Sequence, residues 1–107
     1  GGMSYRNPKL LKLASEAPRC MNPVCGKPNS GDIVACHSNS QRHGKGMGLK
    51  AHDAPAYLCS ECHDYLDGRK GSMCRADRER MFLESAYETW VWLMESGYLR
   101  VVVEVAA

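Results

Sequence analysis

The chain has 107 residues, a formal net charge of +2 and six cysteines. A chain of this length forms one domain with a modest core, so a metal ion or disulfides would add useful stability. No apolar run approaches the roughly 20 residues that a membrane-spanning helix needs, and the weak positive charge permits nucleic-acid binding without favouring it. Gly1 and Gly2 precede Met3 as a cloning remnant would, and we expect a single domain over residues 3–107.

The N-terminal segment does not resemble a secretory leader, because Lys9, Lys12 and Glu16 interrupt its apolar positions. We therefore expect a cytoplasmic protein whose thiols stay reduced. Six cysteines in a secreted chain would suggest three disulfides, whereas closely paired cysteines in a reducing compartment are typical of metal ligands.

A short helix is predicted to begin at Asn7 and Pro8, which suit the N-cap and the first helical position, and to end at Pro18. Cys20 and Cys25 then bound a turn. A glycine directly after the second of these cysteines provides backbone freedom for that turn.

The middle of the chain predicts a strand, a long loop and a second helix. Residues 32–37 carry β-branched side chains and predict a short buried strand. The polar, glycine-rich segment at 38–53 has a length that in compact domains is usually functional or disordered. Residues 56–58 lead into the second cysteine pair, and 60–66 predicts a short helix that Gly68 ends.

The longest predicted helix covers residues 76–96, and Gly97 is a natural C-terminal cap for it. Apolar side chains recur at helical spacing and predict a core-facing side. They are Phe82, Ala86, Trp90, Leu93 and Met94. Trp92 does not lie on this side, so we expect it to be exposed or to contact a partner. The β-prone residues 99–103 are expected to pair with a strand or to cover the core.

Four of the cysteines form two close pairs, Cys20-x4-Cys25 and Cys59-x2-Cys62. Structural zinc takes four soft ligands at tetrahedral corners, and two short-spaced cysteine pairs supply them. The second pair lies at the start of a predicted helix, where the helix dipole also favours thiolates. The spacing therefore predicts a structural Zn²⁺ site.

The histidines are not explained by that zinc site. His37 ends the predicted strand, and His63 follows Cys62 directly on the predicted helix. Successive residues on a helix diverge by about 100°, so Cys62 and His63 do not easily serve one metal. A strand histidine and a helix histidine that face each other would form a second cation site or an acid–base pair.

Together these motifs resemble the HNH endonucleases, the ββα-metal branch of the treble-clef fold. The order that carries the resemblance is Cys-x4-Cys, a strand histidine, a loop, and Leu-Cys-x2-Cys-His. The segments at 35–39, 44–46 and 58–64 are similar to those of phage and prophage nucleases of the YbcO type, which are related to RecA-dependent phage nucleases. The resemblance extends over roughly residues 8–100.

The resemblance implies an α+β fold with a small zinc-binding treble-clef core, an N-terminal helix and a long C-terminal helix. It implies metal-dependent hydrolysis of DNA phosphodiester bonds, in a phage- or prophage-encoded protein linked to a recombinase such as RecA. It implies that His37 is the general base, that Asn39 orients it, and that His63 is a ligand of a second divalent cation, Mg²⁺, Mn²⁺ or Zn²⁺.

One position departs from the HNH pattern. Cys36 stands directly before His37, where such motifs often have Asp or His, so the second ligand of the cation would come from His52 or Asp53. Cations of the glycine-rich loop would contact phosphates, or would belong to an ordinary surface loop. They are Arg42, Lys45 and Lys50.

Two other functions are open alternatives. A non-catalytic zinc module that binds nucleic acid or a protein partner would also need the four paired cysteines, and Cys36 at a usual ligand position favours it. A thiol redox protein that uses Cys59-x2-Cys62 is disfavoured, because both cysteines already match a zinc site. Cys36 and Cys74 have no partner in the zinc pattern.

Overall fold

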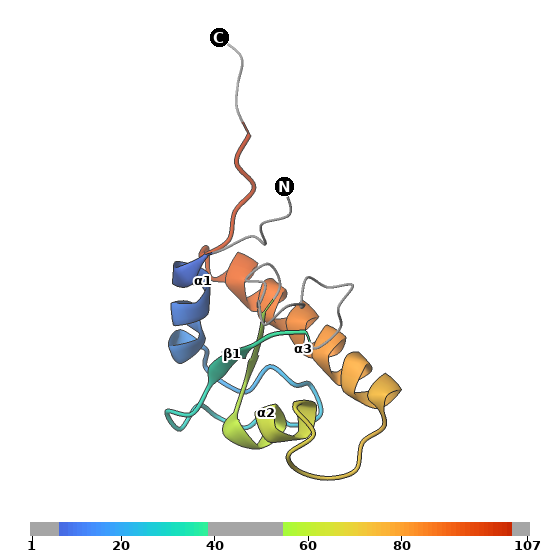
Figure 1. Cartoon of the computed structure of the whole chain (residues 1–107). Coiled ribbons are helices and arrows are strands. Elements are labelled where there is room, and N and C mark those ends of the chain that lie inside the picture. Colours follow the sequence, from blue (N-terminus) through green and yellow to red (C-terminus); the bar gives the residue numbers. More distant parts are fainter. Residues whose placement is uncertain (1–6, 39–54, 104–107) are drawn as a thin grey trace.

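The computed structural model describes residues 7–38 and 55–103, which form an α+β domain (Figure 1). The elements in chain order are α1 (Pro8–Lys12), the 3-10 helix η1 (Leu13–Glu16), β1 (Val34–Cys36), β2 (Ala56–Leu58), α2 (Ser60–Leu66) and α3 (Arg75–Glu95). Within these residues, none of the helices has the length and apolar character that crossing a membrane requires.

The predicted N-terminal helix is confirmed. The Asn7 side chain caps it by accepting a hydrogen bond from the Leu10 backbone N–H at 3.2 Å, and Pro8 occupies the first turn. The five α-helical residues of α1 are followed directly by the 3-10 helix η1. This helix ends at Glu16, because Ala17, which precedes Pro18, has an extended backbone conformation. A residue before proline avoids the helical region, which explains the stop.

β1 and β2 pair antiparallel in a two-stranded sheet, with Ala35 opposite Tyr57. The predicted strand at 32–37 is confirmed at 34–36, but its predicted burial is wrong within these three residues, because Val34 is exposed and Ala35 is only partly buried. On the side of β2 that faces away from β1, the backbone groups of Tyr57 find hydrogen-bond partners without a third strand. The Tyr57 N–H donates to the Thr89 hydroxyl of α3 at 3.1 Å, and the Met21 N–H donates to the Tyr57 carbonyl at 2.9 Å.

α3 packs along β2 (Figure 1) and buries Phe82, Ala86 and Leu93 as predicted, but Trp90 and Met94 of the predicted face are exposed. Its buried residues are Phe82, Ser85, Ala86, Thr89 and Leu93. Trp90 is exposed, whereas Trp92 packs edge-on against Tyr57 with ring centroids 6.1 Å apart. The core position expected for Trp90 is therefore wrong. Small hydroxyl side chains allow a close approach to β2, and Thr89 satisfies a buried backbone N–H there.

The C-terminal prediction is confirmed for the Gly97 cap and for Leu99, and it is wrong for residues 101–103. α3 ends at Glu95, and Gly97 takes a φ of +78° that lets the N–H groups of Tyr98 and Leu99 donate to the Leu93 carbonyl. Leu99 packs against the core, but residues 101–103 form no strand, are exposed, and lead away from the domain (Figure 1). Residues 101–103 cannot pair with β2 at Tyr57, because the N–H and carbonyl of Tyr57 already have hydrogen-bond partners.

Candidate metal centre

The first cysteine pair lies in a tight turn between η1 and β1. The N–H groups of Cys25 and Gly26 both donate to the Asn22 carbonyl, at 3.0 and 2.9 Å, and the Asn22 side chain accepts from the Val24 N–H at 3.1 Å. Gly26 has a φ of +61°, a conformation that residues with a Cβ rarely adopt. We call residues 20–26 the knuckle.

The second pair lies at the start of α2. Cys59 is the N-cap residue and Cys62 lies in the first helical turn. Asp32, just before β1, accepts hydrogen bonds from the Ser60 N–H at 3.1 Å and the Ser60 hydroxyl at 2.8 Å. These hydrogen bonds stabilise the charged carboxylate and lower the pKa of Asp32. The carboxylate thereby anchors the start of α2 to the chain entering the sheet.

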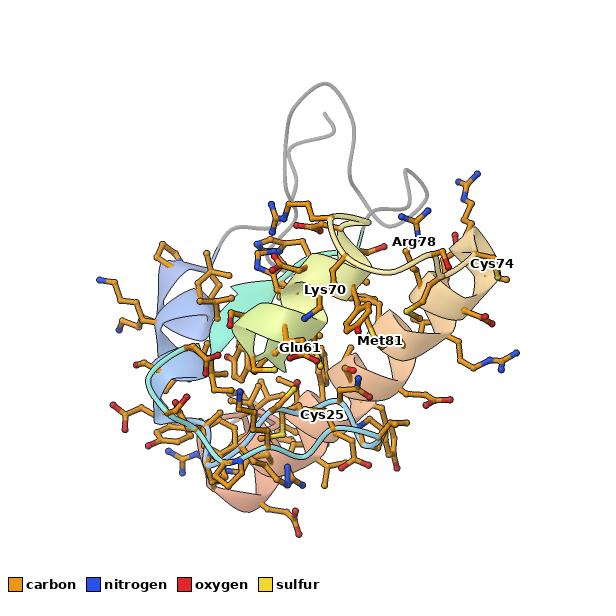
Figure 2. The ribbon with its side chains drawn as sticks, turned by 90° about the horizontal axis from the view of Figure 1, so that it is seen from below. Cys25, Glu61, Lys70, Cys74, Arg78 and Met81 are labelled. Carbon is orange, nitrogen blue, oxygen red and sulfur yellow. The ribbon has the colours of Figure 1, made fainter. Side chains whose placement is uncertain are left out.

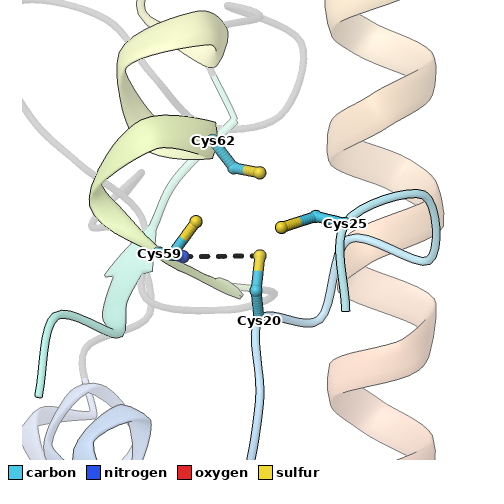
Figure 3. Close-up of side chains that lie close together, drawn as sticks. All are labelled: Cys20, Cys25, Cys59 and Cys62. Carbon is cyan, nitrogen blue, oxygen red and sulfur yellow. Dashed lines mark hydrogen bonds between the residues drawn. The ribbon is translucent and has the colours of Figure 1, made fainter. Parts of the chain in front are cut away.

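The fold brings the two pairs together, and the four sulfur atoms lie within 4.8 Å of one another (Figure 3). Zn–S bonds of about 2.3 Å at tetrahedral angles would place the sulfurs about 3.8 Å apart, so modest side-chain adjustment suffices. Cys20, Cys59 and Cys62 are buried and Cys25 is exposed. The four-cysteine cluster is therefore compatible with structural zinc.

Two N–H groups donate hydrogen bonds to sulfur atoms of the cluster, as expected if these sulfurs are negatively charged thiolates. The Cys59 N–H donates to the Cys20 sulfur at 3.4 Å (Figure 3), and the Asn22 amide donates to the Cys62 sulfur at 3.5 Å. Such outer partners orient metal ligands and stabilise thiolates. Asn22 was missed by the sequence analysis, although an asparagine between two ligands of a tight turn is itself a signal.

Burial opposes ionisation of most of these thiols. It raises the pKa of Cys20 to about 11 and also raises the pKa of Cys62. Burial acts in the same direction on Cys59, but hydrogen bonds from the Cys62 backbone and from neighbouring cysteines outweigh it and lower the pKa. A bound cation would supply the positive charge that converts buried thiols into thiolates.

A second group of polar side chains lies further along α2. The His63 Nε2 and a carboxylate oxygen of Asp67 are 3.0 Å apart, and the Arg69 guanidinium lies 3.1 Å from the same carboxylate oxygen. His63 is half-buried. Asp67 is absent from the sequence-based candidates, although its position four residues after a helical histidine is the spacing at which helix side chains meet.

The end of β1 lies within electrostatic range of Asp67. Cys36 is buried, and burial followed by the negative charge of Asp67 raises its pKa to about 12. His37, the predicted base, follows Cys36 directly and is half-buried. Cys36 does not belong to the four-cysteine cluster, and the exposed Cys74 is the N-cap residue of α3.

Six of the predicted site residues lie outside the residues that the structure describes: Asn39, Arg42, Lys45, Lys50, His52 and Asp53. Their predicted roles therefore stay predictions. Within 7–38 and 55–103, the four-cysteine cluster is the one group of three or more cysteine, histidine or acidic side chains close enough to hold a metal ion. The second cation site is not formed by these residues alone.

A pocket of about 610 Å³ opens beside the cluster, between the knuckle, α2 and α3. Cys25, Glu61 and Met81 come to it from these three elements (Figure 2). Asp77 and Glu84 add negative charge to its lining. Because Cys25 and Cys62 also line the pocket, one side of the cluster is open to solvent-sized molecules.

Comparison with known proteins finds no family model, no curated protein and no solved structure that matches the chain. The resemblance to HNH endonucleases therefore depends on the sequence motifs alone. What the geometry establishes is an α+β domain in which two cysteine pairs, far apart from each other in the sequence, converge on one cluster.

Proposed function

We propose that the chain is a zinc-stabilised nuclease domain of the treble-clef type, which hydrolyses phosphodiester bonds of DNA. The proposal has three parts: the structural zinc, the treble-clef arrangement and the hydrolytic site. Each part is supported by different residues, so each can fail separately.

The cluster of Cys20, Cys25, Cys59 and Cys62 supports the structural zinc. Four thiolates form a closed tetrahedral set with no position left for a substrate, which is typical of structural rather than catalytic zinc. The two N–H groups that donate to sulfur support charged ligands. In this role Zn²⁺ would join the knuckle to the start of α2.

The order of the elements supports the treble-clef type. A knuckle with two ligands precedes the antiparallel β1–β2 pair, and α2 follows with the other two ligands in its N-cap and first turn. In such an arrangement the metal fixes the helix against the hairpin. Side chains at the end of β1 and on the exposed side of α2 are then held at a defined separation.

The observation that carries the hydrolytic proposal is the His63–Asp67 pair beside the end of β1, where His37 follows. Asp67 would orient the imidazole of His63, as carboxylates do for metal-binding histidines. His63 would hold a divalent cation together with His52 or Asp53, and the cation would stabilise charge on the phosphate. His37 would accept a proton from the attacking water.

A cleavage assay tests this proposal on labelled duplex, single-stranded and branched DNA with added Mg²⁺, Mn²⁺ or Zn²⁺. His37→Ala is expected to lower the rate by roughly 100-fold or more, as loss of a general base does. His63→Ala is expected to lower it as well, because it removes a ligand of the cation that stabilises charge on the phosphate. His43→Ala is the matched control, because this histidine has no assigned role. Wild-type rates in His37→Ala, with the fold retained by circular dichroism, would contradict the assignment.

A second candidate, a non-catalytic zinc module that binds nucleic acid or protein, is favoured by two observations. Among the described residues, the four-cysteine cluster is the one group of side chains close enough to bind a metal ion. In addition, Cys36 occupies a position where HNH motifs often have a metal ligand. Retained DNA binding without cleavage of any substrate, under every cation tested, would favour this candidate.

A further inference from the structure

The protein shields the four sulfurs of the cluster unevenly. Cys20, Cys59 and Cys62 each keep at most 5 % of their surface accessible, whereas Cys25 is exposed. Cys25 and Cys62 also line the pocket of about 610 Å³ between the knuckle, α2 and α3. A small solute in this pocket therefore meets the cluster at Cys25 first, with Cys62 behind it.

The hydrogen bonds to the sulfurs are uneven in the same way. The Cys20 sulfur accepts from the Cys59 N–H, and the Cys62 sulfur accepts from the Asn22 amide. The Cys59 sulfur accepts from the Cys62 backbone. Within residues 7–38 and 55–103, no N–H group is found that donates to the Cys25 sulfur. Donated hydrogen bonds stabilise a thiolate and make it a weaker nucleophile, so Cys25 keeps the most nucleophilic sulfur of the four.

Bound zinc would make this exposed sulfur reactive. A thiol that coordinates a cation is deprotonated, and the thiolate is the form that oxidants attack. Susceptibility to oxidation follows thiolate character and exposure, and it is greatest in its consequences where a second cysteine lies beside the first. The Cys25 and Cys62 sulfurs lie within 4.8 Å of each other. Cys74 is equally an exposed cysteine, but it lies outside the cluster.

We propose that Cys25 is an oxidation site through which hydrogen peroxide releases the structural zinc. The Cys25 thiolate attacks one peroxide oxygen, which breaks the O–O bond and yields a sulfenic acid and one hydroxide ion. The Cys62 thiolate then attacks the Cys25 sulfur, which forms a disulfide and expels a second hydroxide ion. Two electrons thus pass from two thiolates to the peroxide. Cys20 and Cys59 remain as two ligands of a metal that takes four, so zinc is lost.

The charge of the pocket selects uncharged oxidants. Three carboxylates and one guanidinium line it, a net charge of −2, from Glu61, Asp77, Glu84 and Arg80. Lys70 lies 3.7 Å from Glu61 and offsets one of these charges. Four thiolates around one Zn²⁺ add a further charge of −2. A negative field of this kind repels anionic reagents and leaves a neutral peroxide unaffected.

Zinc release from the zinc-loaded full chain tests the proposal, with a chromogenic zinc chelator as the readout. Hydrogen peroxide is expected to release one zinc per chain, faster than the chelator alone does, with loss of two free thiols. Tandem mass spectrometry is expected to identify a Cys25–Cys62 disulfide. Cys74→Ser is the matched control and is expected to release zinc at the wild-type rate. Slower release from Cys74→Ser, or a disulfide between other cysteines, would overturn the oxidation site.

The route through the pocket has its own test. Glu84→Lys is expected to leave the peroxide rate unchanged but to raise the rate with a dianionic aromatic disulfide by roughly twofold or more, because it weakens the repulsion. That reagent takes the thiolate into a mixed disulfide and releases an aryl thiolate. Glu95→Lys is the matched control, because it makes the same change on α3 outside the pocket lining. Equal acceleration by both variants would overturn the pocket route.

The inference depends on the structural zinc of the proposed function and not on nuclease activity. The zinc content measured before oxidation separates the two failures. A chain that takes up no zinc would overturn the structural zinc together with the inference. One zinc per chain that hydrogen peroxide does not release would overturn the inference alone.

Discussion

Replacing Cys25 by serine tests the structural zinc with little interference from packing. Cys25 is exposed, so the substitution removes a sulfur ligand without opening a cavity in the core. Cys74→Ser is the matched control, because Cys74 is also an exposed cysteine but lies outside the cluster. The chemical change is the same at both positions.

The expected magnitude follows from the ligand set. Structural zinc contributes about 10–16 kcal/mol of apparent free energy, which averages to about 3 kcal/mol for each of four ligands. A small domain loses about 4–8 °C of melting temperature per kcal/mol, so Cys25→Ser is expected to lower the melting temperature by roughly 12–24 °C. Cys74→Ser places a preferred N-cap residue at the start of α3 without removing a ligand, so it is expected to leave the melting temperature unchanged or to raise it by a few degrees.

Thermal melting followed by circular dichroism measures the effect, with bound zinc quantified in the same samples by mass spectrometry. Wild type and Cys74→Ser are expected to hold one zinc per chain, and chelation is expected to lower the melting temperature of both. Equal melting temperatures for Cys25→Ser and Cys74→Ser would refute the reasoning. So would a wild-type melting temperature that a strong chelator leaves unchanged.

Three further predictions concern the packing of α3, the α2–α3 connection and the cluster. Thr89→Val leaves the buried Tyr57 N–H without its acceptor and is expected to cost about 1–3 kcal/mol in urea unfolding, more than Thr89→Ser, which keeps the hydroxyl. Gly71→Ala is expected to destabilise the protein more than Gly97→Ala, although both glycines have φ above +70°. A Cβ at Gly71 would lie 2.6 Å from a tyrosine ring of α2, whereas a Cβ at Gly97 would have no neighbour within 4 Å. Equal melting temperatures of the two variants would contradict this prediction. Zinc affinity, measured by competition with a chelating dye, is expected to fall as pH falls, because Cys20, whose pKa is about 11, binds zinc only after losing its proton; an affinity independent of pH between 8 and 6 would exclude thiolate ligands.

Local signals in the sequence were enough to predict the helices and the cluster. The bounds predicted for 60–66 agree with α2, and those for 76–96 differ from α3 by one residue at each end. The Asn7 cap and the Gly97 stop are effects of single residues on neighbouring backbone groups. Two short-spaced cysteine pairs likewise predict a four-sulfur cluster, because each pair supplies two ligands from one turn, although it is the fold that brings the two pairs together.

Contacts between distant residues decided the rest. The apolar pattern of α3 selects Trp90 for the core, but β2 needs an acceptor for the Tyr57 N–H, and turning Thr89 toward it leaves Trp90 exposed. The valines at 101–103 favour a strand, but Tyr57 of β2 already has partners for its outward N–H and carbonyl. Strand propensity and helix periodicity describe a segment alone, whereas burial and hydrogen bonding depend on which other segment supplies the partner.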